Sequence, residues 1–320
     1  MTSSWQTLVQ QAKPDTAFSS LDTTPCYMPL DALGLLSVSG EDSQPFLQNL
    51  LTNDIALLAI NHSQYSGLCN PKGRLLALFL IIRTGDTSYQ LIMPKALCEP
   101  ITKRLSMYKL RSKVTITDDS ERMACLGLTL GQVSKLDLAE VDYQGSEQDG
   151  YRHTKLPAQL ARWLIVCEKE AVADLVNKLN NQDYQCQHAD YWLWLDITAG
   201  LASVSQLTQE KFTPQQLNLD LTEAVNFKKG CYPGQEVVAR LHYLGKPSRR
   251  LFIAQAHSQL ALIPGDDIMT AQDSIAGHVV SSVQQGDSLW CLISLKLKEH
   301  ASDLVLSDGK ALTLLSGLVD

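Results

Sequence analysis

The sequence predicts an α+β fold that ends in a small all-β domain, and three observations carry this prediction. Strand-like and amphipathic helical runs alternate between residues 35 and 180, with hairpin turns between neighbouring strands, which favours α+β over a doubly wound parallel sheet. After residue 246 the chain holds only short β-type runs separated by glycine, aspartate and proline, which is typical of a small antiparallel barrel or sandwich. A chain of 320 residues is too long for one compact core, so we expect two or three domains.

The N-terminal half begins with a polar segment and then becomes periodic. Residues 1–30 show little periodicity, so we expect a loosely attached arm. Residues 35–40 have the pattern of a strand, and residues 43–51 have the apolar spacing of an amphipathic helix. Further along we expect strands over 75–83 and 89–93, a helix over 95–111, strands over 113–117 and 124–130, a loop over 131–158, a strand over 163–166 and a helix over 171–179.

A cluster of turn residues at 244–248 marks the best domain boundary. We therefore expect an N-terminal arm (1–30), a main α+β region (31–245) and a C-terminal β-barrel (246–320). The strands expected in the barrel are 250–254, 275–280, 289–295 and 311–315.

Composition and charge exclude several classes of protein. Hydrophobic residues make up 45% and charged residues 19%, which is a normal globular balance. The net charge is −7 and no basic run occurs, so we expect no direct nucleic-acid partner, although a local basic patch stays open. The first ten residues lack the pattern of a signal peptide, and the longest apolar run, Leu75 to Ile82, is too short to span a bilayer. We expect a cytoplasmic protein with no membrane partner.

The cysteines argue against a metal site. Eight are scattered along the chain without a C-x-x-C pair, and a zinc or iron–sulfur site needs local pairs of ligands. In a reducing compartment such cysteines stay thiols. Cys125, Cys167 and Cys291 lie in apolar stretches, so we expect them to be buried packing residues.

The densest unusual stretch is residues 226–240, Asn-Phe-Lys-Lys-Gly-Cys-Tyr-Pro-Gly-Gln-Glu-Val-Val-Ala-Arg. Pro233 suits the first position of a helix, and Glu236 favours its positive end. Cys231 would then precede that end and lie beside Lys228 and Lys229, and both influences lower the pKa of a thiol. The local pattern fits a reactive thiol and an inert buried cysteine at a capped helix start equally well.

The string Lys-Gly-Cys-Tyr-x-Gly-Gln-Glu within this stretch resembles the signature of the YgfZ family, a branch of the folate-binding superfamily that includes the glycine-cleavage T-protein. The resemblance extends over about residues 30 to 255 in scattered blocks that keep the same order. The further blocks are Gly40-Glu41-Asp42, Phe46-Leu47-Gln48, Leu51 to Ile55, Asn70 to Arg74, Ile197 to Leu201, Phe212-Thr213-Pro214 and Asn218-Leu219.

The resemblance implies a T-protein-like scaffold in which residues 31–245 form two intertwined α+β subdomains, one of them about 115–190, arranged around a folate pocket. It implies that tetrahydrofolate or a one-carbon derivative binds without a covalent bond. It also implies a role in maintaining iron–sulfur enzymes, including radical tRNA methylthiolases. Within that reading Cys231 is the functional thiol, and Lys229 and Glu236 are its electrostatic and structural support.

The same resemblance suggests residues that contact the folate. Trp192 aligns with a tryptophan that the family uses against the pterin, and Trp194 lies two residues on, although either ring reads equally well as a core aromatic. The family's other stacking tryptophan falls at Leu33, and its pterin-binding glutamate falls at Thr198, whose hydroxyl is a weaker acceptor. The remaining candidates are Lys72 and Arg74, which could meet the glutamyl carboxylates of folate but fit a solvated loop as well.

One departure bears on activity. Catalytic T-proteins place an aspartate shortly after the turn that corresponds to residues 70–74, whereas this chain continues with Leu75-Leu76-Ala77 and offers no carboxylate. We therefore favour a folate-dependent accessory factor and leave open whether the protein is an enzyme. The alternatives are a tetrahydrofolate-dependent aminomethyltransferase, a thiol-nucleophile enzyme without folate, and a pure interaction scaffold.

Overall fold

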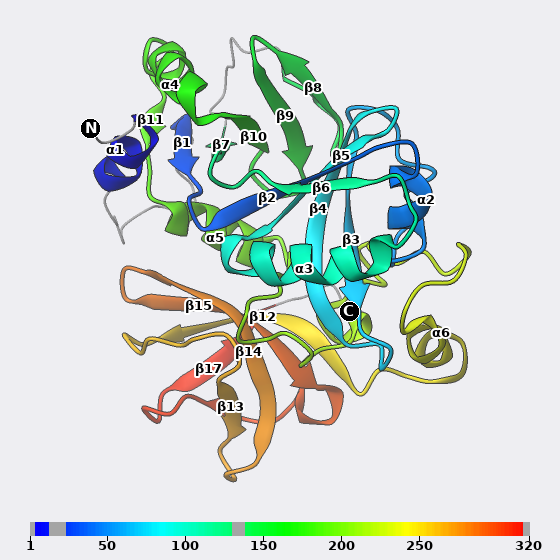
Figure 1. Cartoon of the computed structure of the whole chain (residues 1–320). Coiled ribbons are helices and arrows are strands. Elements are labelled where there is room, and N and C mark those ends of the chain that lie inside the picture. The colour runs from blue at the N-terminus through cyan, green and yellow to red at the C-terminus, as the bar shows by residue number, and fades with distance from the viewer. Residues whose placement is uncertain (1–3, 13–23, 130–137, 316–320) are drawn as a thin grey trace. The chain divides into compact units, whose positions relative to one another are not determined.

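The computed structural model describes residues 4–12, 24–129 and 138–315 (Figure 1). The chain forms two compact units and passes between them several times, so each unit is built from separated stretches of sequence. None of the helices in the described ranges is long and apolar enough to cross a membrane. The first unit comprises residues 1–44, 57–64 and 80–195, and the second comprises residues 45–56, 65–79 and 196–320.

A mixed six-stranded sheet in the first unit has the order β11-β1-β7-β10-β9-β8. Its central strands β7 and β10 pair antiparallel along their whole length, and their apolar runs are buried on both faces. Strand β1 pairs antiparallel with β7 and parallel with β11. The bounds are β1 Cys26–Pro29, β7 Met123–Thr129, β8 Gly145–Gln148, β9 Tyr151–Leu156, β10 Arg162–Glu168 and β11 Gln185–Cys186.

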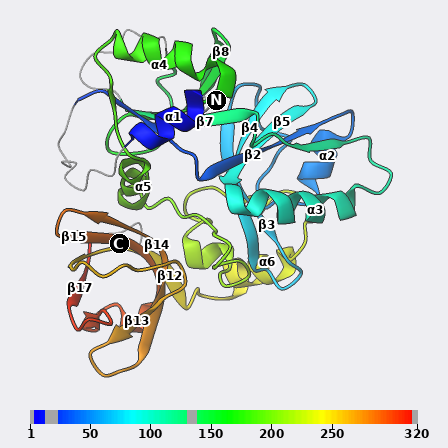
Figure 2. The same ribbon diagram turned by 60° about the vertical axis from the view of Figure 1, so that its left-hand side comes forward.

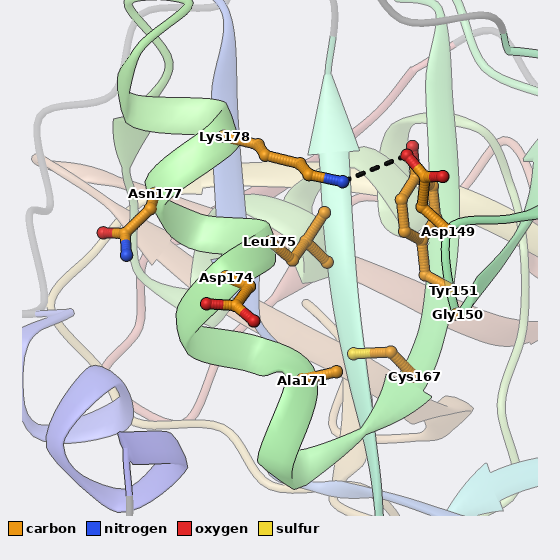
Figure 3. A pocket seen from close by; sticks show the side chains of 9 residues that line it. All are labelled: Asp149, Gly150, Tyr151, Cys167, Ala171, Asp174, Leu175, Asn177 and Lys178. Carbon is orange, nitrogen blue, oxygen red and sulfur yellow. Dashed lines mark hydrogen bonds and ion pairs between the residues drawn. The ribbon is translucent and has the colours of Figure 1, made fainter.

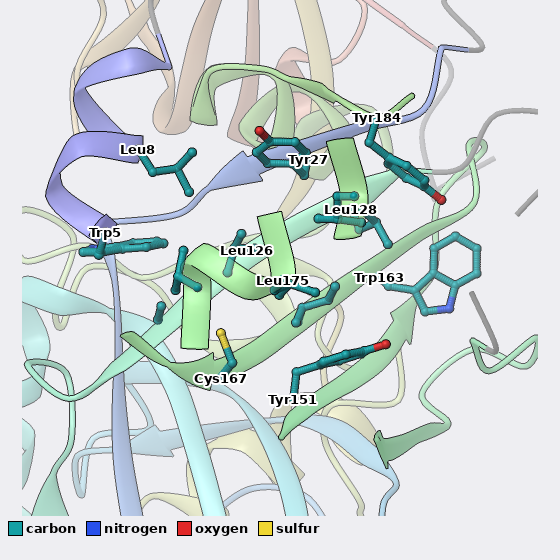
Figure 4. Close-up of a cluster of buried hydrophobic side chains, with 14 residues drawn as sticks. Trp5, Leu8, Tyr27, Leu126, Leu128, Tyr151, Trp163, Cys167, Leu175 and Tyr184 are labelled. Atoms are coloured by element: carbon teal, nitrogen blue, oxygen red, sulfur yellow. The ribbon is translucent and has the colours of Figure 1, made fainter. Parts of the chain in front are cut away.

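Two helices complete the core of this sheet (Figure 4). Helix α4, Val172–Asn180, buries Leu175 and Leu179, and helix α1, Ser4–Gln11, buries Trp5 and Leu8 in the same cluster. The described part of the N-terminal arm is therefore packed, and the expectation of loose attachment is wrong there, because eight residues with two apolar side chains on one face are enough to dock a helix.

The predicted loop over 131–158 is also wrong where the structure describes it. Residues 138–158 include the antiparallel hairpin of β8 and β9. The sequence hides this strand because two of its buried side chains are polar, and both have partners: His153 Nε2 accepts a hydrogen bond from the Ala139 amide at 3.0 Å, and Thr154 bonds with Ser63 at 2.7 Å. Residues 130–137 lie outside the described ranges.

A second sheet has the order β3-β4-β5-β2-β6 and confirms the predicted strands and hairpin near residue 85. The predicted helix over 95–111 is also confirmed: a 3-10 turn, Lys95–Leu97, leads into α3, Cys98–Lys109, which buries Cys98, Ile101 and Leu105 on one stripe. The other bounds are β2 Leu33–Ser39, α2 Ser43–Gln48, β3 Ser63–Cys69, β4 Leu75–Gly85, β5 Ser88–Pro94, β6 Thr115–Asp118, a 3-10 turn Lys169–Ala171 and α5 Ala189–Thr198.

The C-terminal part of the second unit is a closed barrel with the order β12-β15-β14-β13-β16-β17, as predicted (Figure 2). Alternate residues of β12 and β15, such as Phe252, Ala254, Cys291 and Ile293, fill its interior. The sequence missed β13 and β16, which are four and two residues long. The bounds are β12 Arg249–His257, β13 Asp267–Thr270, β14 Ile275–Gln285, β15 Ser288–Lys296, a 3-10 turn Leu297–Glu299, β16 Leu304–Val305 and β17 Ala311–Leu314.

Buried polar contacts join the barrel to the segment before it, within the same unit. Arg250 forms a two-pronged ion pair with Asp220, with nitrogen–oxygen distances of 2.6 and 3.0 Å. The side-chain amide of Asn218 accepts from the Leu251 amide and donates to the Leu251 carbonyl. These contacts fix the barrel against the 3-10 turn Pro214–Leu217 and the chain that leads to helix α6, Gln235–Leu244.

Candidate functional site

The residues around Cys231 form a loop, residues 226–234, which we call the signature loop. Lys229 is buried there, and its ammonium nitrogen donates hydrogen bonds to the carbonyl oxygens of Gln48 at 2.6 Å, Leu51 at 2.5 Å and Asn53 at 2.9 Å. These three acceptors use all the donors that an ammonium group has. A single side chain thus fastens the loop to the end of α2 and the residues that follow it.

Burial lowers the pKa of Lys229 to about 8, against a weaker raising effect of the Asp54 carboxylate. The ring of Tyr232 lies 5.5 Å from the same nitrogen. The charge of Lys229 therefore lies inside the unit, among carbonyls and a ring.

The backbone of the signature loop is fixed by a second set of contacts to the same segment. The side-chain oxygen of Asn226 accepts from the amides of Lys228 at 2.8 Å and Lys229 at 3.1 Å. The Asn226 amide donates to the Thr52 carbonyl at 3.0 Å, and the Asn53 side chain donates to the Glu223 carbonyl at 2.8 Å. Two sequence blocks about 170 residues apart are thereby joined into one structure.

Helix α6 begins at Gln235, two residues later than the sequence suggested, because Gly234 has a φ of 81° and breaks the helical path before it. A Cβ at Gly234 would lie 2.4 Å from the Asn70 carbonyl oxygen, so only glycine permits this approach. The start of the helix thus packs on the turn that begins at Asn70. Glu236 lies in the first helical turn with its side chain exposed to solvent.

Cys231 is the one exposed cysteine of the eight, all of which lie in the described ranges. The predicted burial of Cys125, Cys167 and Cys291 is confirmed, and burial raises the pKa of each thiol to about 12. Besides Cys231, only Cys186 is not fully buried. The accessible sulfur of this protein is therefore in the signature loop.

The ring of Trp192 packs inside the first unit. It is 6% exposed, the Arg162 guanidinium lies 4.6 Å from the ring centroid, and the absence of a Cβ at Gly127 of β7 gives it room, since that atom would come within 2.3 Å of the ring. Trp194 is buried to the same degree and stacks on Tyr191, with centroids 5.8 Å apart. Protein atoms thus occupy the surroundings of both rings.

The other residues suggested for folate are less buried. Leu33 is half-buried at the start of β2, in the first unit. Thr198 is half-buried at the end of α5, and it belongs to the second unit with Lys72 and Arg74. Lys72 is exposed, whereas Arg74 donates to the Lys211 carbonyl at 2.6 Å and borders a hollow of about 560 Å³.

A separate hollow of about 360 Å³ lies in the first unit between α4 and the turn of the β8–β9 hairpin (Figure 3). Lys178 reaches across it from α4 to Asp149, with a nitrogen–oxygen distance of 3.0 Å. None of the catalytic or folate-binding residues suggested by the sequence lines this hollow. Within the described ranges, no group of three or more histidine, cysteine, aspartate or glutamate side chains could hold a metal ion.

Comparison with known proteins gives a consistent result. Residues 27–141 match the family model described as the GCVT N-terminal domain. The chain is 30% identical over 253 residues to the tRNA-modifying protein YgfZ of Colwellia psychrerythraea, covering 76% of this chain and 75% of the relative. It is 28% identical over 305 residues to the protein of that name from Photorhabdus laumondii, covering 89% of each.

Among solved structures, the fold is similar to that of the glycine cleavage system aminomethyltransferase T from Bartonella henselae. The TM-score is 0.76 and the sequence identity is 17%, over 97% of this chain and 95% of that chain. The similarity confirms the T-protein-like scaffold expected from the sequence.

Proposed function

Because the chain belongs to the YgfZ family, we propose that it is a folate-binding accessory protein that maintains iron–sulfur enzymes, among them enzymes that modify tRNA. The observation that carries this proposal is the placement of Cys231, the single exposed thiol, on a loop that Lys229 holds by three hydrogen bonds. A thiol that acts on a partner protein must be accessible and held in position, and the other cysteines are buried or half-buried.

Three residues have distinct roles in this proposal. Cys231 is the functional thiol that meets the client enzyme. Lys229 is a positioning residue, because its ammonium group contacts backbone carbonyls. Glu236 lies in the first turn of α6, where a carboxylate stabilises the positive end of the helix that follows the thiol.

Tetrahydrofolate or a one-carbon derivative is the proposed cofactor, and the chemistry it supplies when bound is one-carbon chemistry. Leu33, in the first unit, and Thr198, in the second, are each half-buried, and each fits a contact role taken by itself. The fit of the two tryptophans is poorer. With Trp192 6% exposed and Arg162 over its ring, a pterin would stack there only after Arg162 moved.

An aminomethyltransferase is the main rival. Leu76 and Ala77, at the place where catalytic T-proteins have an aspartate shortly after the turn, are buried in β4 and have no titratable group. Turnover with a lipoyl carrier protein and tetrahydrofolate would favour this rival over the accessory role.

The thiol is tested with Cys231→Ala in cells that depend on this protein, by measuring methylthiolated tRNA nucleosides by mass spectrometry. We expect the modification to fall to the level of cells without the protein. The matched control is Cys186→Ala, which removes the other cysteine that is not fully buried and leaves the modification intact. Full modification with Cys231→Ala contradicts the proposal.

The cofactor is tested by calorimetric titration with tetrahydrofolate. We expect saturable binding to the wild type and an unchanged affinity for Cys231→Ala. Thr198→Glu introduces the carboxylate that the family resemblance implies at this position and should tighten binding. Absence of heat at two temperatures, together with an unchanged Tm of the wild type at millimolar tetrahydrofolate, excludes this cofactor. The result for Cys231→Ala then stands as a separate test of the thiol.

A further inference from the structure

The hollow beside Arg74 gathers positive charge from three separate parts of the sequence. Its volume is about 560 Å³, within the usual range for small-ligand pockets, and it lies wholly in the second unit. Arg74 reaches it from the turn before β4, Arg249 from the first position of β12, and Lys296 and Lys298 from the end of β15 and the turn after it. No carboxylate lines it.

Most of this charge is uncompensated by the protein. Among the residues that the structure describes, Arg74, Arg249 and Lys296 form no ion pair, and Lys298 has only a 3.4 Å contact with Glu299. The Lys296 ammonium donates one hydrogen bond, to the Ile275 carbonyl of β14 at 2.5 Å, which no negative charge accompanies. Arg74 is held in place by the Lys211 carbonyl and, at 3.4 Å, by Gln216 Oε1. Both acceptors bind the same guanidinium nitrogen, so the others remain available for a ligand.

The register of the barrel makes this arrangement costly. Arg249 and Lys296 are directly opposite each other on the antiparallel strands β12 and β15. Opposite residues on one face have their Cβ atoms about 5 Å apart, and two like charges in that position destabilise a sheet. The proximity of these two charges therefore does not stabilise the barrel, and an anion bound beside both side chains offsets the repulsion between them.

We propose that this hollow binds a small ligand through two or more phosphate groups that lie close together. Arginine guanidinium groups match the planar, two-pronged geometry of phosphate oxygens, and lysines add point charges. The hollow is concave, which suits a compact ligand. The whole chain carries a net charge of −7, so the electrostatic field of the protein does not favour a long polyanion over a compact one. This inference is independent of the folate proposal.

The test is calorimetric titration of the full chain with inorganic pyrophosphate. We expect one site on the wild type and a loss of affinity of about tenfold or more in Arg249→Gln/Lys296→Gln, since two charge-assisted contacts are removed. The control, Lys103→Gln/Lys310→Gln, removes the same charge from two exposed lysines outside the hollow and should change the affinity less than about twofold. Equal weakening in both variants overturns the site.

Further measurements identify the source of the phosphate. Pyrophosphate should raise the Tm of the wild type and leave that of Arg249→Gln/Lys296→Gln unchanged, which also shows that this variant is folded. If a short unstructured RNA binds with the same dependence on Arg249 and Lys296 while pyrophosphate does not, the compact ligand is wrong and backbone phosphates occupy the hollow. If a tri-γ-glutamate peptide binds as tightly as pyrophosphate, the assignment to phosphate is overturned.

Discussion

The ammonium nitrogen of Lys229 lies 2.5 Å from the carbonyl oxygen of Leu51, which is 178 residues earlier in the chain. The Lys229 ammonium group donates hydrogen bonds to carbonyl oxygens at and after the end of a short helix. Without the lysine, these carbonyl oxygens would lack a donor. The loop that carries the exposed thiol two residues later is thereby joined to the segment that follows this helix.

Replacing Lys229 with methionine should destabilise the protein by about 2–3 kcal/mol, because it keeps the side-chain volume and leaves three carbonyl oxygens without their charged donor. The measurement is the free energy of unfolding of the full chain in urea. Lys228→Met is the matched control, since that side chain is exposed, and it should be within about 0.5 kcal/mol of the wild type. Equal effects of the two changes would show that the three hydrogen bonds contribute nothing.

The same lysine predicts a pH dependence of stability. Its pKa is about 8 in the folded protein, because of burial, and 10.5 is its ordinary value. Between these two pH values the unfolded chain holds a proton that the folded chain has released, so the free energy of unfolding rises with pH, by at most about 1.4 kcal/mol per pH unit. Below pH 8 both states are protonated and the slope vanishes.

Urea unfolding of the wild type and of Lys229→Met from pH 7 to pH 10.5 isolates this contribution, since all other groups cancel in the difference. Above pH 8 we expect the free energy of unfolding of the wild type to rise relative to that of Lys229→Met. A constant difference would mean that the three carbonyl acceptors keep the ammonium group charged throughout the range.

Thiol labelling under native conditions should give one fast cysteine. Cys231 is exposed, whereas six cysteines are buried away from solvent. Burial also raises the pKa of five of these thiols, Cys69, Cys98, Cys125, Cys167 and Cys291. Mass spectrometry after brief exposure to iodoacetamide should find one adduct, on the peptide that contains Cys231, and none in Cys231→Ala. A fast adduct on any of the six buried cysteines would show that the core opens readily.

Gly127→Ala should destabilise the first unit by about 1–3 kcal/mol, because a Cβ at that position would lie 2.3 Å from the Trp192 ring and the ring has no room to shift. Near-ultraviolet circular dichroism and the Tm report the change. Gly230→Ala is the control, since its Cβ would have no neighbour within 4 Å and should change the Tm little. If Gly127→Ala leaves the Tm unchanged, the Trp192 ring is free to move. A pterin could then stack on this ring.

Much of the fold followed from local pattern. The hairpin near residue 85, the helix at Cys98–Lys109 and four strands of the barrel were predicted because their buried residues are apolar and regularly spaced. The strands that the sequence did not predict lack this apolar, regular pattern. Strand β9 buries a histidine and a threonine that find polar partners, strand β16 is too short to show a period, and β13 has only two buried residues, one of them a threonine.

The sequence by itself determined the family and the α+β scaffold with its final barrel, and it singled out the stretch around Cys231 as the candidate site, because those depend on local order along the chain. Only the tertiary structure decided where charge lies. It turned Lys229 inward onto three carbonyls, placed Arg162 over Trp192, and brought Arg74, Arg249, Lys296 and Lys298 to one hollow from three distant segments. Electrostatic energy depends on distance in space, which spacing along the sequence does not contain.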